Sequence, residues 1–159
     1  MSIETNQNKA VIESFYTAFA NGDAVGMNQQ YADNIVFEDP AFGQLKGQDA
    51  KDMWLLLMER SQGMKLTFDN ISATTTTATA HWKAVYAYGP QKRMVTNLVT
   101  AQFELKDGKI TKHTDDFDLW KWSSQALGVA GKLLGWSSFM RNKIQEQTGK
   151  LLKDYQAKK

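Results

Sequence analysis

Apolar residues in the first third of the chain recur every three or four positions, which is the spacing of one helix face. This pattern predicts a helix that ends at the turn and capping residues 21–23. A short second helix is predicted from about 24 to 31, and a third over 48–61. The apolar positions that carry the pattern in the first and third helices are Val11, Phe15, Ala18, Phe19, Met53, Trp54, Leu57 and Met58.

The rest of the fold alternates with a period of two, as strands with one buried face do. Residues 35–39 predict a short strand that ends at Pro40. Lys106–Gly108 is a hairpin signal and the threonine run 74–77 a hairpin corner. Further strands are predicted over 65–72, 77–88, 93–105 and 109–122.

Helices followed by an antiparallel meander predict an α+β fold, in which the helices cover one face of a curved sheet. Beyond the sheet, Gly128–Gly135 is interpreted as a small-residue connection. The tail from Lys132 is predicted to be an amphipathic helix, and we divide the chain into a domain over 1–131 and this helix over 132–159. Its stripe contains Trp136, Met140, Ile144, Gln147, Leu151 and Tyr155.

Composition narrows the class of protein. A chain of 159 residues with 42% hydrophobic content is typical of one globular domain. It has no cysteine, so disulfides, thiolate metal sites and cysteine nucleophiles are excluded. We find no apolar run of about 20 residues and no signal-peptide pattern, and we expect a cytoplasmic protein without membrane insertion.

Charge is distributed unevenly. Residues 132–159 carry seven basic and two acidic residues, a net charge of +5, which leaves −3 for the rest. A basic amphipathic helix can pack on its own protein, lie on an anionic membrane or contact nucleic acid. We favour packing on the domain or on a dimer partner, and we expect no nucleic-acid binding because the strands lack a basic and aromatic pattern.

Two stretches resemble the nuclear-transport-factor-two-like superfamily, which includes ketosteroid isomerases, limonene-epoxide hydrolases and SnoaL-like polyketide cyclases. Residues 21–43, "NGDAVGMNQQYADNIVFEDPAFG", are similar to a segment of the isomerases. Residues 103–122, "FELKDGKITKHTDDFDLWKW", are similar to the last hairpin of the epoxide hydrolases. The resemblance implies a cone-shaped, cystatin-like α+β roll around an apolar cavity, often paired as a homodimer. It implies a small hydrophobic ligand and no cofactor.

The resemblance also implies site residues. Asp39 matches the isomerases' catalytic carboxylate, but Phe15 and Ala101 stand where those enzymes hold the enolate oxygen with hydrogen-bond donors. Loss of one such donor typically costs about 10²–10³ in rate. Tyr16 is adjacent to Phe15, but one helical residue turns the direction by about 100°, so it should point elsewhere.

Of the epoxide hydrolases' water-activating set, only the aspartate on the last strand is matched, by Asp115. The positions of the set's other members hold Phe37, Asp39, Trp82 and Ala84. Neither known reaction is therefore predicted in its usual form.

If Asp39 and Asp115 face inward, as the resemblance implies, strand alternation places His113 on the inner face too, and Glu38, Asp116 and Asp118 on the outer one. We take the first three as candidate catalytic residues. Asp39 equally fits a turn-capping residue before Pro40. No metal site is expected, because the two histidines lie on separate strands with opposite facing. The predicted ligand-binding walls are Phe15, Phe37, Trp54, Trp82, Tyr86, Ala101, Phe103 and Phe117.

Two functions stay open at this point. One is an acid–base enzyme, a cofactor-independent isomerase, hydrolase or cyclase in which Asp39 is the base. The other is a non-catalytic ligand carrier or protein-interaction module of the same fold.

Overall fold

The computed structural model describes residues 2–158. Three helices open the chain: α1 (Ile3–Ala20), α2 (Ala24–Gln29) and, after two strands, α3 (Gln48–Arg60). α1 begins where the Ser2 hydroxyl accepts a hydrogen bond from the backbone N–H of Thr5. α2 begins at Asp23, whose carboxylate accepts from the N–H of Gly26. These two caps set the helix starts that the spacing predicts only approximately.

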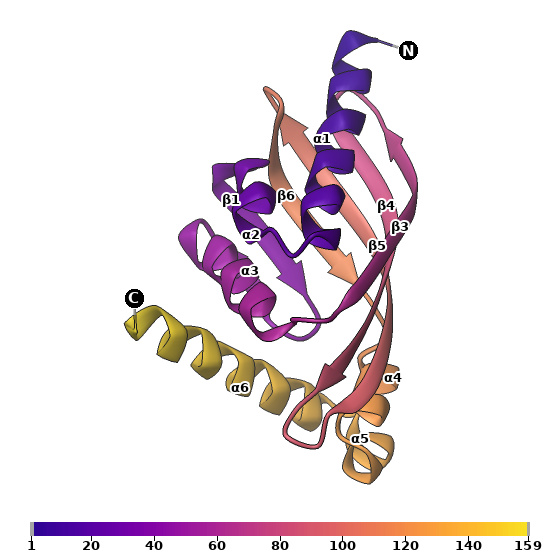
Figure 1. The fold of residues 1–159 in the computed structure, drawn as a ribbon, viewed down its shortest axis with the longest axis vertical. Coiled ribbons are helices and arrows are strands. Elements are labelled where there is room, and N and C mark those ends of the chain that lie inside the picture. The colour runs from indigo at the N-terminus through magenta and orange to yellow at the C-terminus, as the bar shows by residue number, and fades with distance from the viewer. Residues whose placement is uncertain (1, 159) are drawn as a thin grey trace.

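The six strands form one curved sheet in the order β2-β1-β6-β5-β4-β3. α1, α2 and α3 all lie on its concave face (Figure 1). The predicted α+β fold is therefore confirmed, with most strand ends within one residue of their expected positions. The strands are β1 (Tyr31–Asp39), β2 (Gly43–Lys46), β3 (Lys65–Ala73), β4 (Thr77–Tyr88), β5 (Arg93–Lys106) and β6 (Lys109–Asp116).

One strand pair departs from the predicted antiparallel sheet. β1 and β6 run parallel, with Phe37 opposite His113. The other pairs are antiparallel because short turns join them. Between β1 and β6 the chain runs through α3 and four other strands, so no hairpin fixes the relative direction of these two strands. Because they are parallel, both strands finish at the same end of the sheet, β1 at Asp39 and β6 at Asp116.

The region after β6 is helical, which corrects two predictions. The last strand stops at Asp116 instead of continuing to 122, and Leu119–Ala126 forms α4. The Asp118 carboxylate caps this helix by accepting from the N–H of Lys121 at 3.1 Å. The glycine-flanked segment predicted as a connection forms a short helix, α5 (Val129–Leu134).

The C-terminal helix, α6 (Ser138–Ala157), starts later than predicted because Ser137 caps it, accepting from the N–H of Met140 at 3.1 Å. Its stripe is also corrected. Trp136 precedes the helix and is 70% exposed, and Gln147 is exposed. Leu151 and Tyr155 are partly buried, and the fully packed positions are Met140, Ile144 and Leu152.

α6 crosses the end of the concave face, as Figure 1 shows. Gln145 Nε2 donates to the carbonyl of Pro40 at 3.1 Å, and the Thr148 hydroxyl donates to that of Ala41 at 2.8 Å. At the far end of the helix, Gln156 Nε2 donates to Asp49 and Asp52 of α3. We call this end of the concave face, where β1 and β6 finish and α6 crosses, the mouth.

Two apolar clusters divide the interior. The deep cluster lies between the sheet and the first three helices, and it includes Phe15, Trp54 and Phe103. The second, at the mouth, joins the end of β1 and the start of β5 to α4 and α6 through Ala41, Val95, Trp122 and Ile144. Among the described residues, no helix combines the length and apolar character needed to cross a bilayer.

Candidate functional site

Asp39 is the last residue of β1 and stands at the mouth. Its Oδ1 accepts hydrogen bonds from the backbone N–H groups of Ala41, at 2.9 Å, and Phe42, at 2.6 Å. These bonds close the turn around Pro40 that leads into β2. The other carboxylate oxygen has no hydrogen-bond partner among the described residues, and the side chain is half-buried. One oxygen therefore holds the turn while the other is free.

The pKa of Asp39 is raised to about 7. Burial is the largest cause, because removing a carboxylate from water disfavours its charged form. The N–H of Phe42 opposes the rise, and the nearby carboxylate of Asp115 adds to it. Asp39 therefore changes charge near neutral pH.

Asp115 and His113 lie on the inner face of β6 and are both buried. His113 Nε2 contacts Asp115 Oδ1 at 2.8 Å, and Trp82 Nε1 donates to the same oxygen at 3.4 Å. On its other side, His113 Nδ1 lies 2.6 Å from the hydroxyl of Tyr31. That hydroxyl accepts from Trp54 Nε1 at 2.9 Å. The result is a buried hydrogen-bonded chain from α3 to the mouth.

The donors and acceptors of this chain fix the histidine tautomer. The Tyr31 oxygen already accepts from Trp54, so its O–H is free to donate to His113 Nδ1. In a neutral imidazole, Nε2 then carries the proton and donates to Asp115. With this assignment every polar hydrogen in the chain has an acceptor. His113 thereby orients the Asp115 carboxylate beside Asp39.

The deep interior is occupied by aromatic rings packed around His113. The ring of Phe103 lies 4.4 Å from the imidazole, that of Phe37 5.1 Å and that of Phe15 5.4 Å, measured between centroids. Of the eight predicted wall residues, five are at most 3% exposed and belong to this packing: Phe15, Phe37, Trp54, Ala101 and Phe103.

The other three predicted walls, Trp82, Tyr86 and Phe117, are partly exposed near the mouth. The hydroxyl of Tyr86 accepts from Trp122 Nε1 at 2.8 Å. Burial raises the pKa of Tyr86, and the charge of Asp39 contributes to that rise. Tyr86 and Phe117 pack against the apolar cluster at the mouth, whereas Trp82 packs against the deep cluster.

Tyr16 does not contribute to this group, as expected. Its side chain is nonetheless fully buried, with its ring 5.5 Å from that of Phe68, and its hydroxyl has no hydrogen-bond partner within residues 2–158. Burial is the main reason why the pKa of Tyr16 is raised.

A hollow of about 390 Å³ at the mouth reaches both carboxylates. Most of its lining comes from outward-facing polar residues of β1, β5 and β6, and α6 closes one side. Its lining residues are Glu38, Asp39, Pro40, Gly43, Thr100, Gln102, Thr114, Asp115, Asp116, Arg141 and Gln145.

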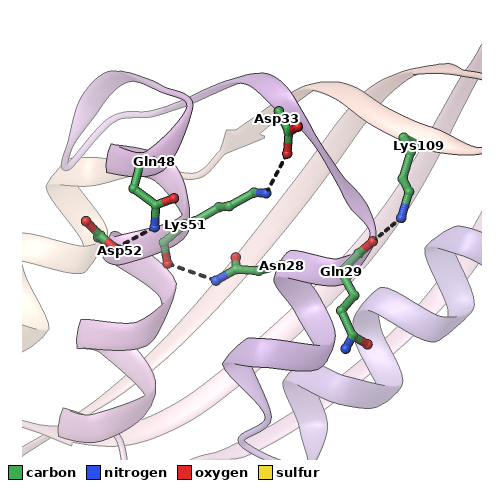
Figure 2. Close-up of polar contacts among 7 residues, drawn as sticks. All are labelled: Asn28, Gln29, Asp33, Gln48, Lys51, Asp52 and Lys109. Carbon is green, nitrogen blue, oxygen red and sulfur yellow. Dashed lines mark hydrogen bonds and ion pairs between the residues drawn. The ribbon is translucent and has the colours of Figure 1, made fainter.

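A larger hollow, about 900 Å³, lies at the opposite end of β1. Figure 2 shows the polar contacts around it. Lys51 Nζ lies 3.5 Å from Asp33 Oδ1, Asn28 Nδ2 donates to the carbonyl of Lys51, and Lys109 Nζ donates to that of Gln29. None of the candidate catalytic residues lines this hollow, whereas Asp39 and Asp115 both line the hollow at the mouth. We therefore place the candidate site at the mouth.

Sequence reasoning missed three residues of the mouth and its hydrogen-bonded chain. The helical pattern predicts Tyr31 at the end of the second helix, but the residue begins β1, shares the alternation of Ile35 and Phe37 and is buried with them. Arg141 and Gln145 had no signal, because the path of α6 across the mouth depends on tertiary packing. The described residues contain no group of His, Asp or Glu side chains arranged to hold a metal ion.

Comparison with known proteins identifies the fold family. No curated protein matches the chain. Among solved structures, an LEH-like epoxide hydrolase of M. tuberculosis is 24% identical, with a TM-score of 0.63, covering 82% of this chain and 97% of that one. Bal32a, from a soil-derived mobile gene cassette, is 19% identical with a TM-score of 0.66, covering 77% and 98%. TerC, co-crystallised with polyporic acid, is 18% identical with a TM-score of 0.61, covering 82% and 99%.

At these identities the structural neighbours establish a shared fold. The family itself follows from the sequence match, because residues 12–113 fit the model of the SnoaL-like domain. That stretch runs from the middle of α1 to the middle of β6, and so includes Asp39 and His113. The chain therefore belongs to the SnoaL-like domain family.

Proposed function

We propose that this chain binds a small, mostly apolar molecule at the mouth and acts on it as a cofactor-independent acid–base enzyme, with Asp39 as the general base. The observation that carries the proposal is the state of Asp39, which has one free oxygen and a pKa raised to about 7. A base with a pKa near the working pH combines a useful ionised fraction with strong proton affinity.

Neighbouring groups supply the other roles. His113 holds Asp115 beside Asp39, and this second carboxylate raises the proton affinity of the first. Because Phe15 and Ala101 cannot donate a hydrogen bond, oxyanion stabilisation falls to another group. The Tyr86 hydroxyl accepts from Trp122, so its own proton can be donated to a developing negative charge.

The named neighbours support a small-molecule reaction. One is an LEH-like epoxide hydrolase, and TerC was crystallised with polyporic acid. For this chain, hydrolysis, isomerisation or cyclisation would share one step, removal of a proton from a substrate carbon or from water by Asp39. Trp82, Tyr86 and Phe117 would form the walls against the apolar part of the substrate.

The proton-abstraction step can be tested with 5-nitrobenzisoxazole, which reports on a carboxylate base without knowledge of the natural substrate. The base removes the proton from the ring C–H, the ring N–O bond breaks, and a nitrile and a phenolate form. We expect the protein to accelerate this elimination, with a rate that increases through about pH 7 as Asp39 ionises. Asp39→Asn should lower kcat/KM by at least about 10².

Asp69→Asn is the matched control, since it makes the same change at an exposed carboxylate on β3, the edge strand farthest from β1. Its rate should stay within about twofold of the parent, because a solvated carboxylate is a weak base toward carbon. Equal losses in both variants, or a rate independent of Asp39, would show that no specific base exists at this position.

Non-catalytic binding is the second candidate function. One observation favours it. Aromatic rings fill the deep interior, so a ligand could bind only at the mouth. Titration with polyporic acid, followed by quenching of tryptophan fluorescence, separates the two. Saturable quenching that Trp82→Leu weakens, together with no elimination activity, would establish a carrier.

The predicted homodimer is also proposed here. Met94 and Leu98 are 63% and 57% exposed on the outer face of β5, and they could pack against a second copy. Light scattering should then give twice the monomer mass. Leu98→Lys should return the protein to a monomer.

A further inference from the structure

Seven large apolar side chains are exposed together at one end of the molecule. They come from α4, α5, the first turn of α6 and the short connections between these helices, a region that lies at the opposite end of the long axis from the N-terminus (Figure 1). We call them the α4–α5 patch. Its residues are Trp120, Leu127, Val129, Leu133, Leu134, Trp136 and Phe139.

Within the part of the chain that is described, exposed large apolar residues are concentrated in this patch. Twelve large apolar residues are exposed there, and seven of them fall between Trp120 and Phe139. Val129, Trp136 and Phe139 are 72%, 70% and 68% exposed. Scattered exposed apolar residues are normal, but a cluster of this kind marks a surface that meets another apolar phase.

The patch is built on a fixed support. α5 packs so closely on α4 that a Cβ on Gly131 would lie 1.9 Å from the carbonyl oxygen of Ser123. Trp120 Nε1 donates to the carbonyl of Lys132 at 3.1 Å, and Trp136 Nε1 to that of Leu133 at 3.0 Å. Both indole N–H groups are thus paired within the protein. The rings can leave water without abandoning a hydrogen bond.

The segment that carries the patch is mainly basic, with the exposed Asp118 at the start of α4 as the neighbouring acidic residue. Residues 119–145 contain Lys121, Lys132, Arg141 and Lys143 and no acidic residue. All four cations are exposed. Arg93 adds a fifth beside the patch, because its Nε donates to the carbonyl of Gln125 in α4 at 2.9 Å. Exposed apolar side chains together with exposed cations complement the surface of an anionic bilayer, where acyl chains lie beneath phosphate groups.

We propose that the α4–α5 patch docks reversibly on membranes that contain anionic lipids. The apolar side chains enter the head-group region to a depth of about 5–10 Å, and the cations contact lipid phosphates. Tryptophan suits this interface because its ring is apolar and polarisable. The patch lies on the surface and does not span the bilayer.

A second copy of the chain fits the patch less well. An isologous contact would place each protomer's four cations of residues 119–145 against the same four of its partner. Repulsion between like charges opposes such pairing, whereas the same charges attract an anionic lipid surface. The charge pattern therefore selects the membrane over self-association.

Vesicle flotation tests the proposal with the full chain. The probes are vesicles of phosphatidylcholine alone and of phosphatidylcholine with about 30% phosphatidylglycerol, at low salt. We expect binding to the anionic vesicles, little to the neutral ones, and a loss of binding as salt increases. Trp136→Ser/Phe139→Ser and, separately, Lys132→Glu/Lys143→Glu should each reduce binding about tenfold.

Matched controls are available elsewhere on the surface. Ile3→Ser removes an apolar side chain that is 76% exposed at the other end of the molecule. Lys46→Glu/Lys65→Glu reverses two exposed charges on β2 and β3, so it changes net charge equally. Binding should persist in both controls.

Three outcomes would overturn the proposal. One is failure of the parent protein to bind anionic vesicles, and another is an equal loss of binding in the patch and control variants. The third is a concentration-dependent dimer that the patch variants abolish while vesicles bind nothing, which would assign the patch to a second copy. The elimination assay is independent of all three, so a failure here leaves the proposed function untouched.

Discussion

Asp39 combines two roles that the sequence presents as alternatives, a turn-capping residue and a base. The structure gives each role its own oxygen. Oδ1 accepts the two backbone N–H groups that close the turn around Pro40, and the second oxygen has no partner among the described residues. A capping carboxylate is usually well solvated, whereas burial here raises the pKa to about 7. The cap therefore holds a titratable group at the mouth.

Substitution of Asp39 should change the pH dependence of stability. Because its pKa is higher folded than unfolded, the native state binds the extra proton between about pH 4 and 7, and stability falls as pH rises through that window. Asp39→Asn keeps an oxygen for the turn and removes this cost. We expect the variant to gain about 1–2 kcal/mol over the parent at pH 8, after discounting for partial solvent exposure.

Urea unfolding at about pH 4.5 and pH 8 measures the effect. The advantage of Asp39→Asn should be small at the lower pH, where the folded parent already carries the proton. Asp69→Asn, at the exposed carboxylate on β3, should show no such pH-dependent gain. A stability difference that is the same at both pH values would mean that the mutation acts through packing instead of charge.

At the scale of elements, the contact between α4 and α5 depends on one missing side chain. Gly131→Ala would place a Cβ 1.9 Å from the Ser123 carbonyl oxygen, so the two helices must separate. We expect a loss of about 1–3 kcal/mol, since overpacking a close contact typically costs that much. Thermal unfolding gives the measurement.

Gly149→Ala is the matched control in α6, where a new Cβ would have no heavy atom within 4 Å. It should be neutral or slightly stabilising, because alanine favours a helix over glycine by about 0.5–1 kcal/mol. If Gly131→Ala were tolerated as well as Gly149→Ala, α5 would not be held against α4 in solution.

The sequence predicts elements well where local chemistry determines them. β4 begins and ends at the expected residues, and the hairpin at Lys106–Gly108 has Asp107 and Gly108 at positive φ. Prediction fails beyond β6, where Phe117, Leu119 and Trp122 continue an apolar pattern that suits a strand or a helix. Asp118 decides the outcome as a helix cap, and a single capping residue is a weak signal in isolation.

The candidate site was predictable only in part. Alternation correctly separates the inner Asp115 from the outer Asp116, because it follows from strand geometry alone. It cannot show that His113 bridges Tyr31 and Asp115, since that contact joins residues 82 positions apart. Nor can it show that the predicted wall residues fill the deep interior, because their packing depends on the distance between the helices and the sheet.

At the scale of the whole molecule, α6 joins the two apolar clusters. Leu152 packs in the deep cluster and Ile144 in the cluster at the mouth. Ile144→Ala should therefore destabilise the protein by about 2–4 kcal/mol, since it leaves a cavity at a position that is 4% exposed. Chemical denaturation measures the loss.

Phe139→Ala tests the same helix on its outer side. This side chain is 68% exposed, and its removal should change stability by less than about 0.5 kcal/mol. A large loss in Phe139→Ala would mean that the α4–α5 patch is covered by the protein itself, whereas no loss in Ile144→Ala would mean that α6 is detached from the mouth.

The crossing helix also bears on how the chain is made. α6 is synthesised after every segment that it contacts, yet its hydrogen-bond partners Pro40, Ala41 and Asp49 precede it by more than a hundred residues. The sheet and the first three helices can therefore assemble on the ribosome before α6 emerges. During that interval the hollow beside Asp39 lacks the side that α6 supplies through Arg141 and Gln145, and it is bounded only once the helix has docked.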